Sequence, residues 1–243
     1  MFDFNLNGKA ASSVGVLAVR RPNIPTPQLR YKTVTIPNVS GGFIQSENAY
    51  DLIKFEVECN FLSSSPETFN EEARAVRSWL FSEQSSQLSF SDDPDWCYLT
   101  KVIQPSDIER TSRCVGVFTI TVICEPYVYL LDGLTEVDLP THVSNLYETA
   151  KPIYKLNGSG QFQINLKRNI VSSATLQLRI TVTNSCTIDT QLEIAYGPNG
   201  LDQVQQISRG DISDLIIPHG GYTFTKTVPD GGSITYIPRW RSL

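Results

Sequence analysis

The strongest constraint on the fold of this chain is an alternation of apolar and polar residues along residues 50–62, YDLIKFEVECNFL. One set of alternate positions is apolar and the set between them is mostly charged: Ile53, Phe55, Val57 and Cys59 against Leu52, Lys54, Glu56 and Glu58. Because successive side chains of a strand point to opposite faces, this period of two predicts a strand with one buried face. Residues 29–37 also alternate and lead into a turn, NVSGG, while residues 114–131 are apolar almost throughout and predict a central strand.

A single helix is predicted within this first half, at about residues 65–81. Ser65 can cap it, and Pro66 fits its first position, where a missing N–H costs nothing. Apolar side chains recur at helical spacing and form a stripe that we expect to pack on the sheet: Phe69, Ala73, Val76 and Leu80, with Trp79 beside it. Two further strand patterns, QLSF (87–90) and WCYLTKVI (96–103), follow the helix.

The character of the sequence changes near residue 136. Residues 136–152 are polar, contain two prolines and favour a connection between domains. Strand-like segments separated by Gly-, Asn- or Pro-rich turns follow: IYKLNG, GQFQINL, TLQLRITVTN, TQLEIAYG, DLIIP, YTFTKTV and SITYIP. Short strands at this spacing are typical of a β-sandwich. We therefore expect a mainly β protein, with an N-terminal β domain that contains the helix (1–135) and a C-terminal β-sandwich (136–243).

Composition excludes several classes of protein. The formal net charge of the 243 residues is −5, and a dedicated nucleic-acid binder is not expected because phosphate binding requires a basic surface. No apolar run is long enough to cross a membrane as a helix. The N-terminus also lacks the basic-then-apolar order of a secretory signal. We expect synthesis in the cytoplasm and no insertion into a membrane.

The five cysteines and two histidines suggest neither a zinc site nor a disulfide framework. No two cysteines form a C-x-x-C pair, and the ligand spacing that zinc requires is missing from the sequence. Cys59 and Cys124 fall within apolar strand patterns, where a thiol packs as a small hydrophobic group. We expect all five thiols to be reduced and structural, with no metal ion and no cofactor bound.

The best candidate for chemistry is the acidic segment LSFSDDPDWCYLTKV (88–102). Asp92, Asp93 and Asp95 crowd around Pro94, a grouping that suits a metal ion, acid–base catalysis or an ordinary turn. A calcium loop of the EF-hand type needs acids at alternate positions, a central Gly and a Glu at its twelfth position, which this segment does not provide. A glycosidase pair depends on a carboxyl separation that the sequence does not give. Asp and Pro favour turns, so a hairpin turn is the preferred interpretation.

Other catalytic arrangements are weaker still, and we do not expect an enzyme. The sequence contains neither a G-x-S-x-G elbow nor a glycine-rich phosphate loop. A catalytic triad would have to use His142, in the polar connection, or His219, in the PHGG turn. Near the C-terminus, Trp240 stands between Arg239 and Arg241. Its ring either closes the core beneath these guanidinium groups or offers a platform for a sugar.

Several segments, taken in order, point to one family of proteins. They are FNLNGKAASSVGV, RRPNIPTPQLRYKTVTIPNVSGGF, YDLIKFEVECNF, the helix ending in VRSWLF, LSFSDDPDWCYLTKV, VFTITVICEPYVY, DLIIPHGGYTF and ITYIPRWRSL. Together they span nearly the whole chain and resemble the distal tail protein (Dit) family of long-tailed, non-contractile phages (siphophages) of Gram-positive bacteria. One departure is Asn38, which stands where that family usually has Gly.

The resemblance implies a structural protein of the virion without catalytic activity. Its N-terminal domain would form a homohexameric ring at the distal end of the tail, with a galectin-like C-terminal β-sandwich outside. The implied partners are further copies of the chain, the tail-tube protein, the tail-tip protein and receptor-binding proteins, with DNA passing through the bore without specific binding. The alternative is a carbohydrate-binding adhesin that contacts host cell-wall polysaccharide through the sandwich.

Two expectations about charge follow from such a ring. The acids of the turn are either solvated or reach a neighbouring subunit, and the possible interface residues are Arg20, Arg21, Arg30, Asp92, Asp93 and Asp95. Six copies of a chain with charge −5 carry about −30 in total. We expect a neutral to acidic bore, because a basic lining would bind the phosphates of DNA.

Overall fold

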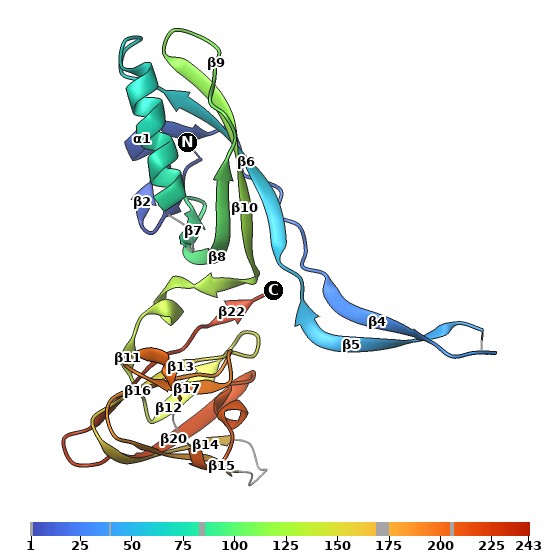
Figure 1. Ribbon diagram of the computed structural model, residues 1–243, viewed down its shortest axis with the longest axis vertical. Helices are drawn as coiled ribbons and strands as arrows, with labels where there is room; N and C mark the ends of the chain where they lie inside the picture. Colours follow the sequence, from blue (N-terminus) through green and yellow to red (C-terminus); the bar gives the residue numbers. More distant parts are fainter. Residues whose placement is uncertain (1, 39, 83–85, 169–174, 205–206) are drawn as a thin grey trace. The chain divides into compact units, whose positions relative to one another are not determined.

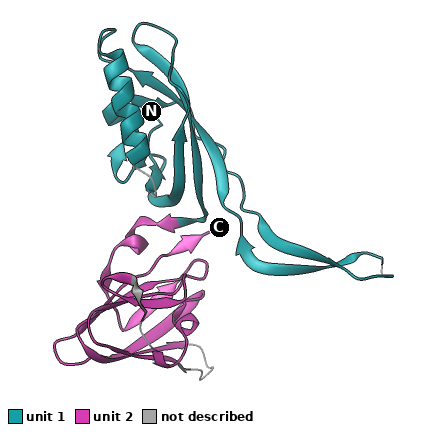
Figure 2. Cartoon of the chain, viewed as in Figure 1, with its two compact units in different colours: residues 1–128, 243 teal, residues 129–242 magenta. Residues whose placement is uncertain are grey.

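The computed structural model describes residues 2–38, 40–82, 86–168, 175–204 and 207–243, which form two compact units (Figures 1 and 2). Unit 1 contains residues 1–128 with residue 243, and unit 2 contains residues 129–242. The chain passes from one unit to the other within a single long strand, β10 (Val115–Leu130). No helix in the described ranges is long and apolar enough to span a membrane. The domain ranges expected from the sequence, 1–135 and 136–243, stay predictions.

Unit 1 is built on one sheet with the strand order β2-β1-β7-β8-β10-β6-β3, and β9 also pairs with β10. The bounds are β1 Phe4–Leu6, β2 Lys9–Ala10, β3 Val16–Ala18, β6 Ile53–Leu62, β7 Gln87–Phe90, β8 Asp93–Pro105 and β9 Glu109–Arg110, with a 3-10 helix η1 at Ala11–Val14. The alternating segment forms β6, which runs antiparallel to β10 from the pair Ile53–Cys124 to the pair Leu62–Val115. As predicted, its apolar positions are buried and its charged positions are exposed.

Helix α1 (Phe69–Ser82) turns its apolar stripe inward as predicted, and it also buries Trp79. The helix begins at Phe69, however, so the expected start at Ser65 is wrong. The hydroxyl oxygen of Ser65 accepts a hydrogen bond from the N–H of Thr68 (3.2 Å), and residues 66–68 form a turn before the helix. Ser65 therefore caps this turn, because its side chain satisfies a backbone donor that would otherwise be free.

The acidic segment forms a hairpin between β7 and β8, as the sequence favoured, but the turn itself is only Ser91–Asp92. Asp93 already pairs with Phe90, and the register then shifts so that Ser89 faces Cys97. Residues 94–96 therefore form a bulge in β8. Pro94 is compatible with this place because proline cannot donate to the ladder of a sheet.

A second hairpin in unit 1, made of β4 (Leu29–Thr35) and β5 (Gly42–Tyr50), forms a separate two-stranded sheet. Figure 2 shows it extending away from the rest of its unit. The alternation in residues 29–37 predicts β4 and the turn after it, whereas β5 is not predicted by any pattern in the sequence. The sequence of β5, GFIQSENAY, has only short apolar runs between polar residues and therefore no clear period. No side chain of β4 is buried.

Unit 2 is a β-sandwich, which confirms the expected architecture of the second half. One sheet has the order β11-β21-β13-β16-β17-β18 and the other β12-β20-β14-β15-β19. The bounds are β11 Val137–Asp138, β12 His142–Asn145, β13 Ile153–Asn157, β14 Gly160–Arg168, β15 Thr175–Val182, β16 Cys186–Asp189, β17 Ile194–Gly197, β18 Gly200–Val204, β19 Ile207–Arg209, β20 Gly220–Thr227 and β21 Ser233–Ile237. The last strand, β22 (Arg241–Ser242), is in neither sheet and pairs with β10. Between the two sheets lies an apolar core that includes the contacting rings of Tyr154, Phe224 and Tyr236.

Two expectations about this half are wrong. Residues 136–152 are not a connection, because they supply β11 and β12 to the two sheets and Leu139 to the core. The segment DLIIP (214–218) is not a strand. Its first two residues end a 3-10 helix, η3 (Ile212–Leu215), and Ile217 makes only an isolated bridge to Ala150. Another 3-10 helix, η2, lies at Leu131–Leu134. The side chains of Asp211 and Asp214 cap η3 reciprocally (both 3.1 Å), and the three-residue spacing buries both Ile212 and Leu215.

The buried thiols give a direct test of the packing. In the native protein at pH 8, iodoacetamide should modify Cys114 first, because Cys114 is half-buried and the other cysteines are buried. Burial raises the pKa of Cys59, Cys97 and Cys124 to about 12 and that of Cys186 to about 11, so their reactive thiolate forms are scarce. Timed labelling followed by mass spectrometry measures this order. All five should react in urea, and equal native rates at Cys59 and Cys114 would contradict the packing.

Candidate interaction surfaces

The β4–β5 hairpin exposes an unusual amount of apolar surface. The large apolar side chains exposed on it and on its loop are Leu29, Tyr31, Val34, Ile36, Phe43 and Ile44. Phe43 is 64% exposed and Ile44 is 72% exposed. Single exposed apolar residues are ordinary, but a group of them on one element marks an interaction surface.

These side chains lie on both faces of the hairpin. Val34 pairs directly with Phe43, so these two share one face, and Ile44 lies on the other face opposite Thr33. Tyr31 has the same parity as Thr33 and lies on the face of Ile44. A two-stranded hairpin with no third strand is marginally stable in water. Both faces of this hairpin therefore expose apolar side chains to a partner.

The conformation of the loop at the end of the hairpin explains why Asn38 can stand where the resembled family usually has Gly. The backbone of Asn38 has φ 63° and that of Gly41 has φ 90°. Left-handed conformations favour Gly, and Asn tolerates them best among the residues with a side chain. Asn38 therefore fills a position that requires the conformation glycine adopts most readily. Val39 lies outside the described residues.

Among the residues expected at an interface, the structure brings Arg21 and Asp92 together within one chain. A guanidinium nitrogen of Arg21 lies 2.5 Å from a carboxylate oxygen of Asp92, and the guanidinium also lies 5.0 Å from the ring centre of Phe90. The hydrogen bond with Arg21 lowers the pKa of Asp92. The pair ties the segment after β3 to the β7–β8 hairpin.

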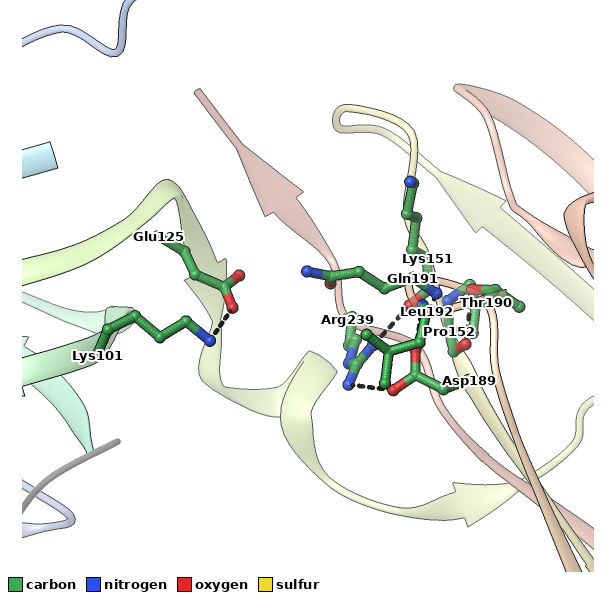
Figure 3. A network of polar contacts seen from close by, with 9 residues as sticks. All are labelled: Lys101, Glu125, Lys151, Pro152, Asp189, Thr190, Gln191, Leu192 and Arg239. Atoms are coloured by element: carbon green, nitrogen blue, oxygen red, sulfur yellow. Dashed lines mark hydrogen bonds and ion pairs between the residues drawn. The ribbon is translucent and has the colours of Figure 1, made fainter. Parts of the chain in front are cut away.

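The other arginines of that set also have partners within the chain. Three further ion pairs of unit 1 are Arg20–Glu58 (3.0 Å), Arg30–Asp51 (2.8 Å) and Lys101–Glu125 (2.7 Å, Figure 3). Asp93 and Asp95 make no ion pair with any described residue, and Asp95 is exposed. A role of these residues between subunits stays a prediction.

A groove lies beside α1 in unit 1, with a volume of about 500 Å³. Its lining includes Lys9, Leu62, Val76 and Trp79. The indole nitrogen of Trp79 is buried and has no hydrogen-bond partner among the described residues, and the ammonium of Lys9 lies 5.4 Å from the ring centre. Leu62 is 52% exposed, so the groove offers an apolar wall to a partner.

The described residues contain no group of three His, Cys, Asp or Glu side chains that could hold a metal ion. The ring nitrogen Nδ1 of His142 lies 3.2 Å from the hydroxyl of Thr223, and His219 is exposed. Trp240 lies half-buried against the core of unit 2. A Cβ atom at Gly133 would come within 2.8 Å of the indole ring, so this glycine makes room for it. Its use as a glycan platform stays a prediction.

The sequence reasoning missed the outer face of the second sheet in the sandwich. Its inward side chains, such as Phe162, Ile164 and Leu178, are buried. The outer face is defined here by three cross-strand rows: Arg209–Arg179–Gln163–Thr227, Gln177–Asn165–Thr225 and Lys167–Thr223–His142. None of these side chains is a carboxylate, and none is Phe, Tyr or Trp. Only the pairing register brings them together, and the sequence does not reveal that register.

Arg239 and Asp189 form the best-shielded ion pair of unit 2 (Figure 3). The two guanidinium nitrogens donate to the two carboxylate oxygens at 3.0 and 3.2 Å. The backbone N–H groups of Gln191 and Leu192 donate to the same carboxylate. Arg239 adopts φ 56°, a conformation that costs free energy for a non-glycine residue. The bidentate pair offsets this cost and fixes the C-terminal segment to the end of β16.

The substitution Arg239→Ala should lower the free energy of unfolding by about 2–3 kcal/mol, because it leaves a buried carboxylate without its charged partner. The side chain of Asp189 is only 7% exposed. The matched control is Arg20→Ala, which removes an exposed pair and should cost less than about 0.5 kcal/mol. Urea unfolding followed by circular dichroism compares the two. Equal losses in the two variants would show that Arg239 is not a stabilising contact.

Comparison with known proteins adds to this geometry. Residues 15–124 match a family model described as the phage tail protein RIFT-related domain. Over the whole chain, the fold is similar to the crystal structure of Dit from phage SPP1, described as a paradigm of the hub adsorption apparatus in phages that infect Gram-positive bacteria. That match has a TM-score of 0.64 at 15% identity and covers 100% of this chain and 98% of that chain.

Chains in two structures of the phage p2 baseplate in its activated conformation, one with Sr and one with Ca, are similar as well. Their TM-scores are 0.54 and 0.55 at 10% identity, over 97% and 100% of this chain and 96% and 98% of those chains. No curated protein matches the sequence significantly. The expected resemblance is confirmed: residues 15–124 match the model of a phage tail protein domain, and the whole chain is similar in fold to a distal tail protein.

Proposed function

We propose that this chain, with its phage tail protein RIFT-related domain and its distal tail protein fold, is a structural hub at the distal end of a siphophage tail. Six copies form a ring that joins the tail-tube protein to the tail-tip protein and its receptor-binding proteins. The ring has no catalytic role, and DNA passes through a neutral to acidic bore without specific binding. The single observation that carries the self-association is the β4–β5 hairpin, which exposes apolar side chains on both faces and pairs with no further strand among the described residues.

A second copy is the partner that best suits this hairpin. Its charged side chains are already neutralised locally by the pairs Arg30–Asp51 and Lys32–Glu47, so the apolar groups near the tip dominate its recognition. The groove beside α1 provides a different, apolar surface on the same chain. When one surface of a subunit fits another surface of the next, the contact is heterologous and repeats until a ring closes. We propose that the hairpin of each copy packs on the groove of its neighbour.

Substitution of the hairpin tip should abolish ring formation. Phe43→Asp combined with Ile44→Asp places a charge on each apolar face, and burial of these charges in a contact is unfavourable. Each subunit should still fold, because neither side chain belongs to either core. Negative-stain electron microscopy and analytical ultracentrifugation measure the result, which is expected to be single subunits in place of six-fold rings.

The control is Gln45→Asp, which adds one negative charge to the same strand at a position that is already polar. This variant should form rings like the unchanged protein. If the wild-type chain needs the tail-tube protein to form rings, the comparison is made in its presence. Rings formed by the doubly charged variant would exclude the hairpin as the ring contact.

A second function is favoured by a separate observation, the outer face of the sheet β12-β20-β14-β15-β19. Its amide and hydroxyl side chains are donors and acceptors of the kind that bind sugar hydroxyl groups. We propose that unit 2 also contacts polysaccharide of the host cell wall, which makes the chain both a hub and an adhesin. This contact uses neither the hairpin nor the groove, which belong to unit 1, so it is compatible with the proposed ring contacts.

A further inference from the structure

The outer face of unit 2 contains two arginines that oppose each other directly. Arg179 on β15 pairs with Arg209 on β19 in the register of the sheet. Like charges at directly opposed positions destabilise a sheet. Neither guanidinium forms an ion pair with any described residue, although five other arginines do. In a chain with a net charge of −5, such an uncompensated pair of cations calls for an anion from outside.

The surroundings of Arg179 support this interpretation. Its Nε atom is buried and has no hydrogen-bond partner among the described residues. One of its terminal nitrogens donates to the side-chain oxygen of Gln163 at 3.3 Å, and this contact orients the guanidinium. A buried donor without an acceptor costs free energy, and because this Nε–H is shielded from an external ligand, binding falls to the terminal nitrogens of the guanidinium.

The chemistry of the face selects the class of ligand. A phosphate group has acceptor oxygens arranged tetrahedrally, so two guanidinium groups can each donate to it from different sides, and a phosphodiester repeats this charge along a polymer. Gln163, Gln177 and Thr227 flank the two arginines and can bind hydroxyl groups. The described face carries no Phe, Tyr or Trp on which a neutral sugar ring could stack.

We propose that Arg179 and Arg209 form a phosphate-binding site for a phosphodiester-linked polyol or sugar polymer of the bacterial surface. The phosphates lie between the two guanidinium groups and the polymer hydroxyls bind the flanking amide and hydroxyl side chains. This inference deepens the second function proposed above and rests on it for the source of the polymer. It is independent of ring assembly, because the site lies wholly within unit 2.

The test uses the full chain and a synthetic oligo(glycerol phosphate), the simplest phosphodiester-linked polyol, in calorimetric titration. The wild-type protein should bind it with an affinity that falls as salt rises, and inorganic phosphate should compete. Arg179→Gln and Arg209→Gln should each weaken binding about tenfold or more, since each removes charge-assisted hydrogen bonds. Arg209→Lys, which keeps the charge without the planar fork, should lie between wild type and Arg209→Gln. The control Arg20→Gln should bind like wild type.

A second readout separates a binding site from a merely structural role. Without ligand, Arg209→Gln should raise the thermal midpoint by about 1–4 °C, because it removes the repulsion between like charges. The oligomer should stabilise the wild type and leave this variant nearly unchanged. A lower midpoint for the unliganded variant would overturn the argument that the pair is uncompensated.

Three binding outcomes would overturn the proposal. One is the lack of binding by the wild-type protein, and another is equal binding by wild type and both glutamine variants. The third is equal or tighter binding of dextran, which would indicate a neutral glycan, or of poly-glutamate, which would indicate an acidic protein partner. Ring formation by the glutamine variants should stay intact, so a failure of this site is distinguishable from a failure of the hub.

Discussion

The pairing of β6 with β10 is the interaction on which the rest of the structure depends. It joins residues 53–62 to residues 115–124 in one continuous antiparallel register. That register aligns two buried rows, and a shift by one residue would turn the charged positions of β6 into the core. The same strand β10 continues into unit 2, so the pairing also fixes where the sandwich starts along the chain.

The parts of the fold that could be predicted from the sequence are those with a clear period. β6 alternates, β10 is apolar along most of its length, and α1 has its stripe, so each was predictable with an error of a few residues at its ends. β5 could not be predicted because its residues pack on no core and therefore need no period. DLIIP looks like a strand because its short apolar run is buried, but the run is divided between two structures. Leu215 ends η3, whose start is set by the side chains of Asp211 and Asp214, and Ile217 makes only an isolated bridge to Ala150.

The interaction surfaces were less predictable than the fold. Arg21 and Asp92 were expected as partners between subunits, and the structure joins them within one chain. The sequence shows that both charges are present, but not whether they pair within one chain or between two copies. The pair Arg179–Arg209 depends on the register of β15 and β19, which are neighbours in the sheet but are separated in sequence by the three strands β16, β17 and β18. The exposure of Phe43 and Ile44 is equally hidden, since an apolar pair in a strand is normally evidence of a core.

In the proposed ring, the hairpin also sets the thermodynamics of closure. An open arc of subunits, whatever its length, leaves one hairpin uncovered at one end and one groove empty at the other. Closing the ring places this hairpin in this groove in a single step, and no further residues have to become ordered. Complete rings are thus favoured over every partial arc, and assembly is cooperative without any conformational signal between subunits. The exposed apolar tip raises the free energy of the free subunit. In the proposed ring, loss of one subunit would expose one hairpin and one groove again, so an incomplete ring would be less stable than a closed one.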